Sequence, residues 1–276
     1  MPQRIIVAFD GSDLAREAFR HALQIAGQSS LPVLVLTIIE PLPLVPTVGD
    51  PLLAFDPSPA IIASPEELAA QSAERRADAE KLLQSLRPLI DRSGAQVELK
   101  AVEGELIPTL CETAREGDLI ALGKKGRFRA AGLGSATRAL VTKAPAPVMI
   151  VSVPYMPLRR VLGVFENTDA GRRAVALAHD LANTTRWPLS ILAVGGHGVD
   201  NEEATAMAKA VAQGAPVVSM PDELEEAQAI EHAAEEARDA VVVMGAYAES
   251  WLHQAIFGAA APRVLKDIGV PVILAH

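Results

Sequence analysis

The stretch Leu119-Ile120-Ala121-Leu122-Gly123-Lys124-Lys125-Gly126 joins a short apolar run to a glycine loop. After seven further residues, Gly134-Ser135 opens a predicted helix over 135–143, and 148–151 is the next predicted strand. A strand, a glycine loop and a helix N-terminus together present backbone N–H groups to an anion. Glycine lets the backbone approach such a ligand closely. The pattern indicates a phosphate site, and the structural alternative is a flexible connection capped by Ser135.

Positive charge gathers around this loop although the chain as a whole is acidic. Residues 119–165 hold eight Lys and Arg and no Asp or Glu, whereas the formal net charge of the 276 residues is −9. An acidic protein with one cationic zone is a poor match for a nucleic-acid backbone. We therefore expect one small polyanion as ligand and no nucleic acid. A solvated loop tip is the ordinary alternative for such lysines and arginines.

Composition indicates a globular protein in a reducing compartment. The chain is 50% hydrophobic and 21% charged, which suits one large domain or two small ones. The single cysteine, Cys111, excludes an intrachain disulfide and is expected to be a small core residue. The N-terminus shows no signal-peptide pattern and no apolar stretch is long enough to span a bilayer. We expect a cytoplasmic protein with no membrane association.

The sequence contains an internal duplication. Residues 4–13 and 160–169 align without a gap, from Arg4 and Arg160 to Asp13 and Asp169. Further matches keep the same order: Ala22/Ala178, Pro32/Pro188, Gly123/Gly245 and 147–150/271–274. This predicts a duplicated unit with domains at 1–153 and 158–276, joined by the proline-flanked linker 154–157.

Strand and helix patterns alternate within each copy. In the first, strands are expected at 4–9, 33–39, 96–102, 119–122 and 148–151, and helices at 13–26, 65–92, 106–115 and 135–143. Such alternation predicts an α/β fold of two tandem doubly wound domains, each with a five-stranded parallel sheet flanked by helices. Ligands of these sheets bind at the carboxyl ends of the strands, so Asp10, Ile38 and Gly123 are expected on one rim.

Few residues suggest catalysis. The Asp10-Gly11-Ser12 turn offers a carboxylate for a ribose, a base or a metal-bound water, or it simply starts a helix. The loop after Leu122 fits neither a Walker A motif nor the dinucleotide fingerprint. No nucleophile–base set and no zinc spacing is present, so no catalytic residue is predicted. The proline-rich segment 40–64 is expected to be a lid, an interaction arm or an ordinary surface loop.

These residues resemble the universal stress protein family in its tandem two-domain form, an adenine nucleotide alpha hydrolase-like fold. The family motif is Gly, two residues, Gly, nine residues, then Gly-Ser or Gly-Thr. Gly123, Gly126, Gly134 and Ser135 supply its residues, but seven residues replace the nine. Asp10, Thr37-Ile38-Ile39-Glu40 and Gly104 also match family positions.

The resemblance implies ATP binding in the first copy, with Mg²⁺ or Mn²⁺ as the accompanying ion. The implied contacts are Asp10, Ile38, Leu122, Gly123, Gly126, Gly134, Ser135, Ala136 and Thr137. Because the loop is two residues short, AMP, ADP or a cyclic nucleotide are alternatives to the triphosphate.

The second copy has lost much of the motif. It keeps the nine-residue spacing but carries Ala248 and Ala259 in place of the second glycine and the serine, and Glu166 in place of Asp10. A Cβ at position 248 blocks close backbone approach. We predict that this half binds no nucleotide and is structural. Family members dimerise through their last strands, so the tandem chain is expected to resemble one dimer, and two chains to form a homodimer.

The leading functional prediction is a cytoplasmic stress-response sensor or regulator that binds ATP in its N-terminal half with little or no turnover. The first alternative is a nucleotide-free stress scaffold that acts through contacts with an unidentified protein. The second is an enzyme on the related nucleotide-binding α/β fold, such as an adenylyl transferase. That alternative ranks low, because Asp10-Gly11-Ser12-Asp13 stands where those enzymes carry their phosphate motif.

Overall fold

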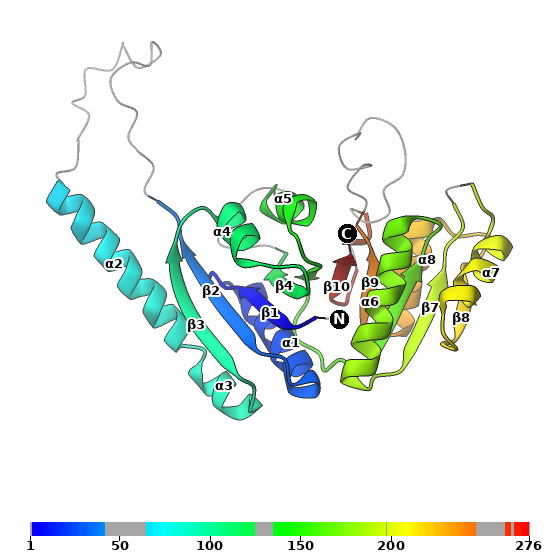
Figure 1. The fold of residues 1–276 in the computed structure, drawn as a ribbon, viewed down its shortest axis with the longest axis horizontal. Coiled ribbons are helices and arrows are strands. Elements are labelled where there is room, and N and C mark those ends of the chain that lie inside the picture. Colours follow the sequence, from blue (N-terminus) through cyan, green and yellow to red (C-terminus); the bar gives the residue numbers. More distant parts are fainter. Residues whose placement is uncertain are drawn as a thin grey trace, which may run out of the picture.

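Ten strands form one continuous sheet with helices on both faces (Figure 1). The computed structural model describes residues 2–41, 65–124, 135–196, 198–246, 263–265 and 268–275. The strand order is β3-β2-β1-β4-β5-β10-β9-β6-β7-β8. The predicted α/β fold, with two tandem doubly wound units, is thereby confirmed.

The N-terminal repeat contributes the first five strands of the chain. They are β1 (Arg4–Ala8), β2 (Val33–Ile39), β3 (Val97–Glu103), β4 (Asp118–Gly123) and β5 (Val148–Val151). The helices between them are α1 (Asp13–Ser29), α2 (Pro65–Gln84), α3 (Arg87–Ser93), α4 (Leu106–Thr113) and α5 (Ser135–Lys143). All four pairings among these strands are parallel.

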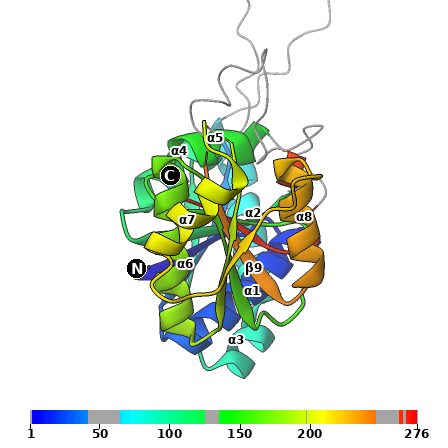
Figure 2. The same cartoon turned by 90° about the vertical axis from the view of Figure 1, so that its right-hand side faces the viewer.

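The C-terminal repeat contributes the other five. Its strands are β6 (Arg160–Phe165), β7 (Leu189–Ala193), β8 (Val217–Ser219), β9 (Ala240–Gly245) and β10 (Val272–Ala275). Its helices are α6 (Asp169–Thr185), α7 (Asn201–Val211) and α8 (Glu226–Glu236). Figure 2 shows α7 and α8 on either side of β9. No helix in the described part of the chain is both long and apolar enough to cross a bilayer.

Strand register repeats between the two halves. Ile5 pairs with Val33 in the first repeat, and Val161 pairs with Leu189 in the second. Each partner lies at the position that the gapless internal alignment gives it. The duplication therefore extends beyond sequence similarity to the hydrogen-bonding register, which is strongly specified wherever sheet faces are buried.

The repeats join edge to edge through an antiparallel pair, β5 with β10. Met149 pairs with Ile273, its own counterpart in the other repeat. Val148 pairs with Leu274 and Ile150 with Val272, so each strand meets the other by the same set of positions. This self-complementary contact is that of a two-fold dimer built into one chain, as the family resemblance implies.

Two apolar layers cover the sheet, and both cross the junction. One layer lies under α4, α5 and α8 and includes Leu110, Leu140 and Ile230. The other lies under α1 and α6 and includes Phe19 and Ala178. The alternation of strand side chains, such as Ile5 and Ile6, divides each strand between the two layers.

The linker between the repeats is held against α1. Gln24 donates from Nε2 to the Leu158 carbonyl at 2.7 Å and accepts from the Leu158 N–H at 2.9 Å. The Tyr155 N–H donates to Glu17 at 3.0 Å, and Arg20 stacks on the Tyr155 ring at 4.3 Å. The polar face of α1 thus fixes the path of the chain from one repeat to the next.

One expectation about the helices is wrong. A single helix was expected over 65–92, but α2 ends at Gln84 and α3 begins at Arg87. Pro88 explains the break, because it has no N–H to donate and its ring clashes with the carbonyl of Gln84. Figure 1 shows α2 leaning away from β3 toward its N-terminal end. The other predicted elements of this repeat agree to within one to three residues at their ends.

Candidate functional site

The carboxyl ends of β1, β2 and β4 lie side by side in the sheet. Four of the predicted site residues come to this edge, namely Asp10, Ile38, Leu122 and Gly123. Ile38 and Leu122 pack on the same apolar layer, below α4 and α5. Asp10, Ile38 and Gly123 are half-buried, whereas Leu122 is buried. The edge therefore combines a carboxylate, an apolar surface and strand-end backbone.

A tight turn holds Asp10 at the end of β1. Gly11 has φ +79°, and Asp10 Oδ1 accepts the Ser12 N–H at 2.9 Å. Ser12 caps α1 by accepting the Ala15 N–H at 3.2 Å. The interpretation of this turn as the start of a helix is therefore confirmed, and Asp10 also lies at the candidate edge.

Thr37, which the family resemblance placed at the end of the second strand, has a role at this edge that the sequence analysis did not predict. Its hydroxyl donates to the Phe9 carbonyl at 2.9 Å and is buried. This bond ties the end of β2 to the turn that carries Asp10. A lone threonine within the apolar run of 33–39 was the available signal, because a buried hydroxyl needs a partner.

Gly123 is required by packing. A Cβ there would lie 2.7 Å from the Leu14 carbonyl carbon and 2.8 Å from the Ala15 nitrogen, at the first turn of α1. Gly245 is in the same situation in the other repeat, 3.0 Å from the Ala170 carbonyl carbon. Since the repeat without the full motif keeps this glycine, close strand–helix contact is enough to account for it.

Only some of the remaining motif residues lie in the described part of the chain. Gly126 and Gly134 lie outside the described residues, as does the proline-rich segment from 42 to 64. Ser135, Ala136 and Thr137 form the first turn of α5, which begins at the predicted residue. At the start of the loop, the Lys124 N–H donates to the Val151 carbonyl at 2.8 Å, which places the chain next to β5.

The equivalent edge of the C-terminal repeat is closed. The residues equivalent to Asp10, Ile38 and Leu122 are Glu166, Val194 and Met244. The exposed fractions of Glu166, Val194 and Met244 are 1%, 1% and 0%. Gly245 is buried where Gly123 is half-buried. The two repeats therefore share strand ends of the same kind but differ in how far those ends are covered.

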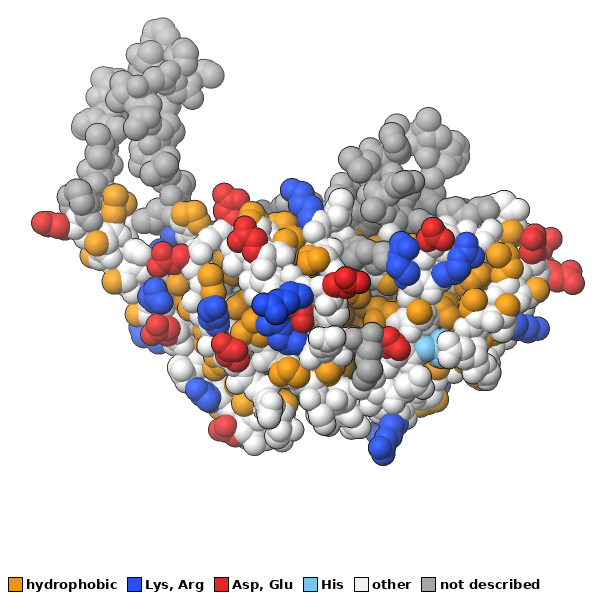
Figure 3. All heavy atoms as spheres, in the orientation of Figure 1, with side chains coloured by type: hydrophobic (Ala, Val, Ile, Leu, Met, Phe, Trp, Pro, Cys, Tyr) orange, Lys and Arg blue, Asp and Glu red, His pale blue; other side chains and the backbone are white. Residues whose placement is uncertain are grey.

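Charge and metal-ligating groups give little further guidance. Figure 3 shows Lys and Arg interspersed with Asp and Glu over one face of the molecule. Among the described residues, no three His, Cys, Asp or Glu side chains gather as a metal site would require. Cys111, expected to be a small core residue, is half-buried on α4 and packs against the margin of an apolar layer, and burial raises the pKa of its thiol.

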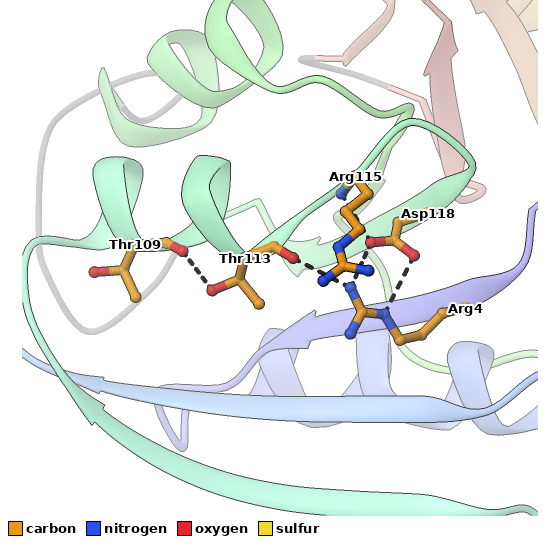
Figure 4. A network of polar contacts seen from close by, with 5 residues as sticks. All are labelled: Arg4, Thr109, Thr113, Arg115 and Asp118. Atoms are coloured by element: carbon orange, nitrogen blue, oxygen red, sulfur yellow. Dashed lines mark hydrogen bonds and ion pairs between the residues drawn. The ribbon is translucent and has the colours of Figure 1, made fainter.

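A polar network lies at the opposite ends of the strands (Figure 4). Arg4 binds Asp118 through two nitrogens at 3.2 and 2.6 Å and donates to the Thr113 carbonyl at 3.1 Å. Asp118 also accepts the Arg115 N–H at 2.9 Å. The network ties the starts of β1 and β4 together, and the Arg160–Asp239 pair at 2.6 Å does the same in the other repeat. Its role is structural.

Comparison with known proteins agrees with this architecture. The model of the universal stress protein family matches residues 1–152. A universal stress protein from Archaeoglobus fulgidus DSM 4304 is similar over 100% of this chain and 98% of its own, with 18% identity and a TM-score of 0.70. A putative universal stress protein from Pseudomonas aeruginosa UCBPP-PA14 is similar over 99% and 93%, with 17% identity and a TM-score of 0.54.

A third structure is that of a universal stress protein in complex with cAMP. It covers 55% of this chain and 97% of its own, with 24% identity and a TM-score of 0.39. No curated protein sequence matches the chain. Because the family match spans more than half of the 276 residues and the duplicated fold accompanies it, the chain belongs to the universal stress protein family.

Proposed function

We propose that this protein is a stress-response sensor or regulator that binds ATP at the carboxyl edge of its N-terminal repeat. The observation that carries the proposal is the difference in burial between matched positions. Asp10, Ile38 and Gly123 are half-buried at the N-terminal edge, whereas the residues equivalent to them in the C-terminal repeat are buried. A ligand edge needs accessible groups, and only the N-terminal repeat offers them at these positions.

The side chains at this edge suit a nucleoside. Ile38 and Leu122 supply apolar contact for a base, and the carboxylate of Asp10 suits the hydroxyl donors of a ribose. The N-terminus of α5 begins at Ser135, where backbone N–H groups favour phosphate. Lys124 adds a cation at the start of the loop. If Mg²⁺ or Mn²⁺ accompanies the phosphates, the Asp10 carboxylate is of the type that would accept a hydrogen bond from the water bound to that ion.

Little or no turnover is part of the proposal. The sequence offers no nucleophile next to a base, and the groups assigned here bind rather than react. We propose that bound nucleotide sets a state of the protein that a partner recognises. Cytoplasmic location and a homodimer of tandem chains belong to the same proposal, and sedimentation velocity of the purified chain tests the dimer.

Calorimetric titration with ATP, with and without Mg²⁺, tests the proposal. We expect about one ATP per chain. Asp10→Asn should weaken binding and Gly126→Val should abolish it, because a side chain at 126 blocks backbone approach. Asp13→Asn is the matched control, since Asp13 is exposed in the same turn and should leave affinity unchanged. Loss of binding in the control alone would contradict the assignment of Asp10.

A nucleotide-free scaffold remains the second candidate, and one observation favours it. From Glu66 to Asp78, every α2 side chain except Arg75 is exposed. Apart from the Arg76–Glu103 ion pair at 3.7 Å, this stretch is exposed in the described part of the chain and offers a surface to another protein. If the folded chain binds neither ATP, ADP, AMP nor cAMP in the titration, this function takes the place of the nucleotide sensor.

A further inference from the structure

Two glutamates meet inside the C-terminal repeat. Glu166 follows β6 and is 1% exposed, and Glu226 is the first residue of α8. Neither carboxyl oxygen of Glu166 has a hydrogen-bond partner among the described residues, and the same is true of Oε1 of Glu226. Buried polar atoms are almost always paired, so three unpaired carboxyl oxygens in one place need an explanation.

These carboxyl oxygens lack a hydrogen-bond donor. Two ionised carboxylates offer only acceptors, so they cannot satisfy one another, and burying the charge of Glu166 next to that of half-buried Glu226 is costly. Burial, followed by the negative charge of Glu226, raises the pKa of Glu166 well above its usual range. A proton on either carboxyl turns one oxygen into a donor to the other.

Besides Glu226, the described groups packed against Glu166 come from α6 and from the end of β7. From α6, Gly171 lies against the backbone of Glu166, and from the end of β7, the Val194 N–H donates to the Phe165 carbonyl at 3.0 Å. The charged residues of the first turns of α6, Asp169, Arg172 and Arg173, are exposed, and Asp169 and Arg172 pair with one another at 3.6 Å. Among the described residues, Glu226 is the charged group that acts on Glu166.

A metal ion fits these surroundings poorly. Magnesium and calcium take at least six oxygen ligands, commonly including water. The described residues bring no third acidic, histidine or cysteine ligand to the pair, and Glu166 is almost fully shielded from solvent. A proton needs neither additional ligands nor space.

We infer that Glu166 and Glu226 share a single proton at neutral pH, and that this singly protonated pair, with one negative charge instead of two, holds the carboxyl edge of the C-terminal repeat closed. The unfolded chain releases that proton, because both glutamates then have ordinary acidity. Raising the pH therefore favours opening of this edge. The pair occupies the position of Asp10 in the other repeat, so it also removes the carboxylate that a ribose would need there.

The Glu166→Gln variant tests the role of the shared proton, because it removes the titratable group from this position. The amide supplies a permanent donor to Glu226 and cannot ionise, while its size is nearly unchanged. Glu223→Gln is the matched control, since it removes one exposed negative charge from the segment just before α8. Glu226→Gln approaches the same pair from the other side and serves if the first variant fails to fold.

Two measurements on the full chain test the inference. Infrared spectroscopy at neutral pH should show the carbonyl band of a protonated carboxyl group in the native chain and the control, and its loss in Glu166→Gln. Between pH 6 and pH 9, the unfolding constant of the native chain should rise by up to about tenfold per pH unit relative to that of Glu166→Gln. Hydrogen exchange should localise the opening to the turn after β6 and the start of α8.

Equal pH slopes for the native chain and Glu166→Gln, with no protonated carboxyl band, would overturn the inference. The same measurements with added Mg²⁺ or Ca²⁺ and with EDTA test the metal alternative. If either ion removes the band and flattens the slope of the native chain alone, the pair is a cation site instead.

Discussion

The two repeats keep the same packing and differ in chemistry. Both place a glycine at the end of the fourth strand, against the first turn of the first helix, and both pair their strands in the same register. At the carboxyl edge, however, half-buried Asp10 and Ile38 correspond to fully covered Glu166 and Val194. The shared geometry is what the fold requires, whereas the difference between a covered and an accessible edge is the basis of the proposed difference in ligand binding.

Substitution of the two equivalent glycines should give the largest difference in unfolding free energy between the repeats. Gly123→Ala places a Cβ 2.7 Å from backbone and should cost about 3 kcal/mol of unfolding free energy. Gly245→Ala meets its neighbours at 3.0 Å and should cost about 1 kcal/mol. Urea denaturation measures both. Equal and negligible costs would show that packing does not require either glycine.

Acid should weaken the N-terminal repeat through His21. This side chain is fully buried with both ring nitrogens unpaired, and burial lowers its pKa to about 4. The unfolded chain therefore takes up a proton between pH 6.5 and pH 4 that the folded chain refuses, and stability falls as the pH falls. The loss should be about 3 kcal/mol at most.

The position equivalent to His21 in α6 is Leu177, so leucine is the natural replacement for His21 in a test of this explanation. Replacing His21 by Leu should remove this part of the acid sensitivity, and His232→Leu, on the exposed surface, should not. Denaturation curves at pH 4 and pH 7 check it. If the native chain and the His21→Leu variant lose the same unfolding free energy between pH 7 and pH 4, the explanation is contradicted.

Matched truncations at the two edges should affect different properties, mainly stability at the C-terminal edge and ATP affinity at the N-terminal edge. Val194→Ala removes buried methyl groups and should cost about 1.5 kcal/mol of stability without changing ATP affinity. Ile38→Ala should cost about 1 kcal/mol or less because Ile38 is half-buried, and should weaken ATP binding about tenfold. If both variants bind ATP as the native chain does, Ile38 is not part of the site.

The smallest effect is expected at the linker. Gln24→Ala removes both hydrogen bonds to Leu158 and should cost about 1 kcal/mol. Because the repeats also join through β5 and β10, they should stay docked in this variant. Small-angle scattering would reveal separated repeats, which would mean that the linker and not the shared sheet sets their arrangement.

Periodicity and repetition made most of the fold predictable. Strand runs such as 33–39 are continuous and apolar, and the duplication located each counterpart by simple alignment. The break before Pro88 was missed because the apolar spacing of 65–92 continues through it. Glu166 could be recognised as a replacement for Asp10, but its meeting with Glu226 could not be predicted, since the two lie 60 residues apart without any periodic pattern. Contacts of that kind depend on tertiary packing.

Hydrogen exchange with and without ATP tests the central difference between the repeats most directly. The account predicts slower exchange in residues 10–15 and 122–124 when ATP is present, and no change in 166–171 and 244–246. Equal protection of both edges, or protection confined to the C-terminal repeat, would contradict it.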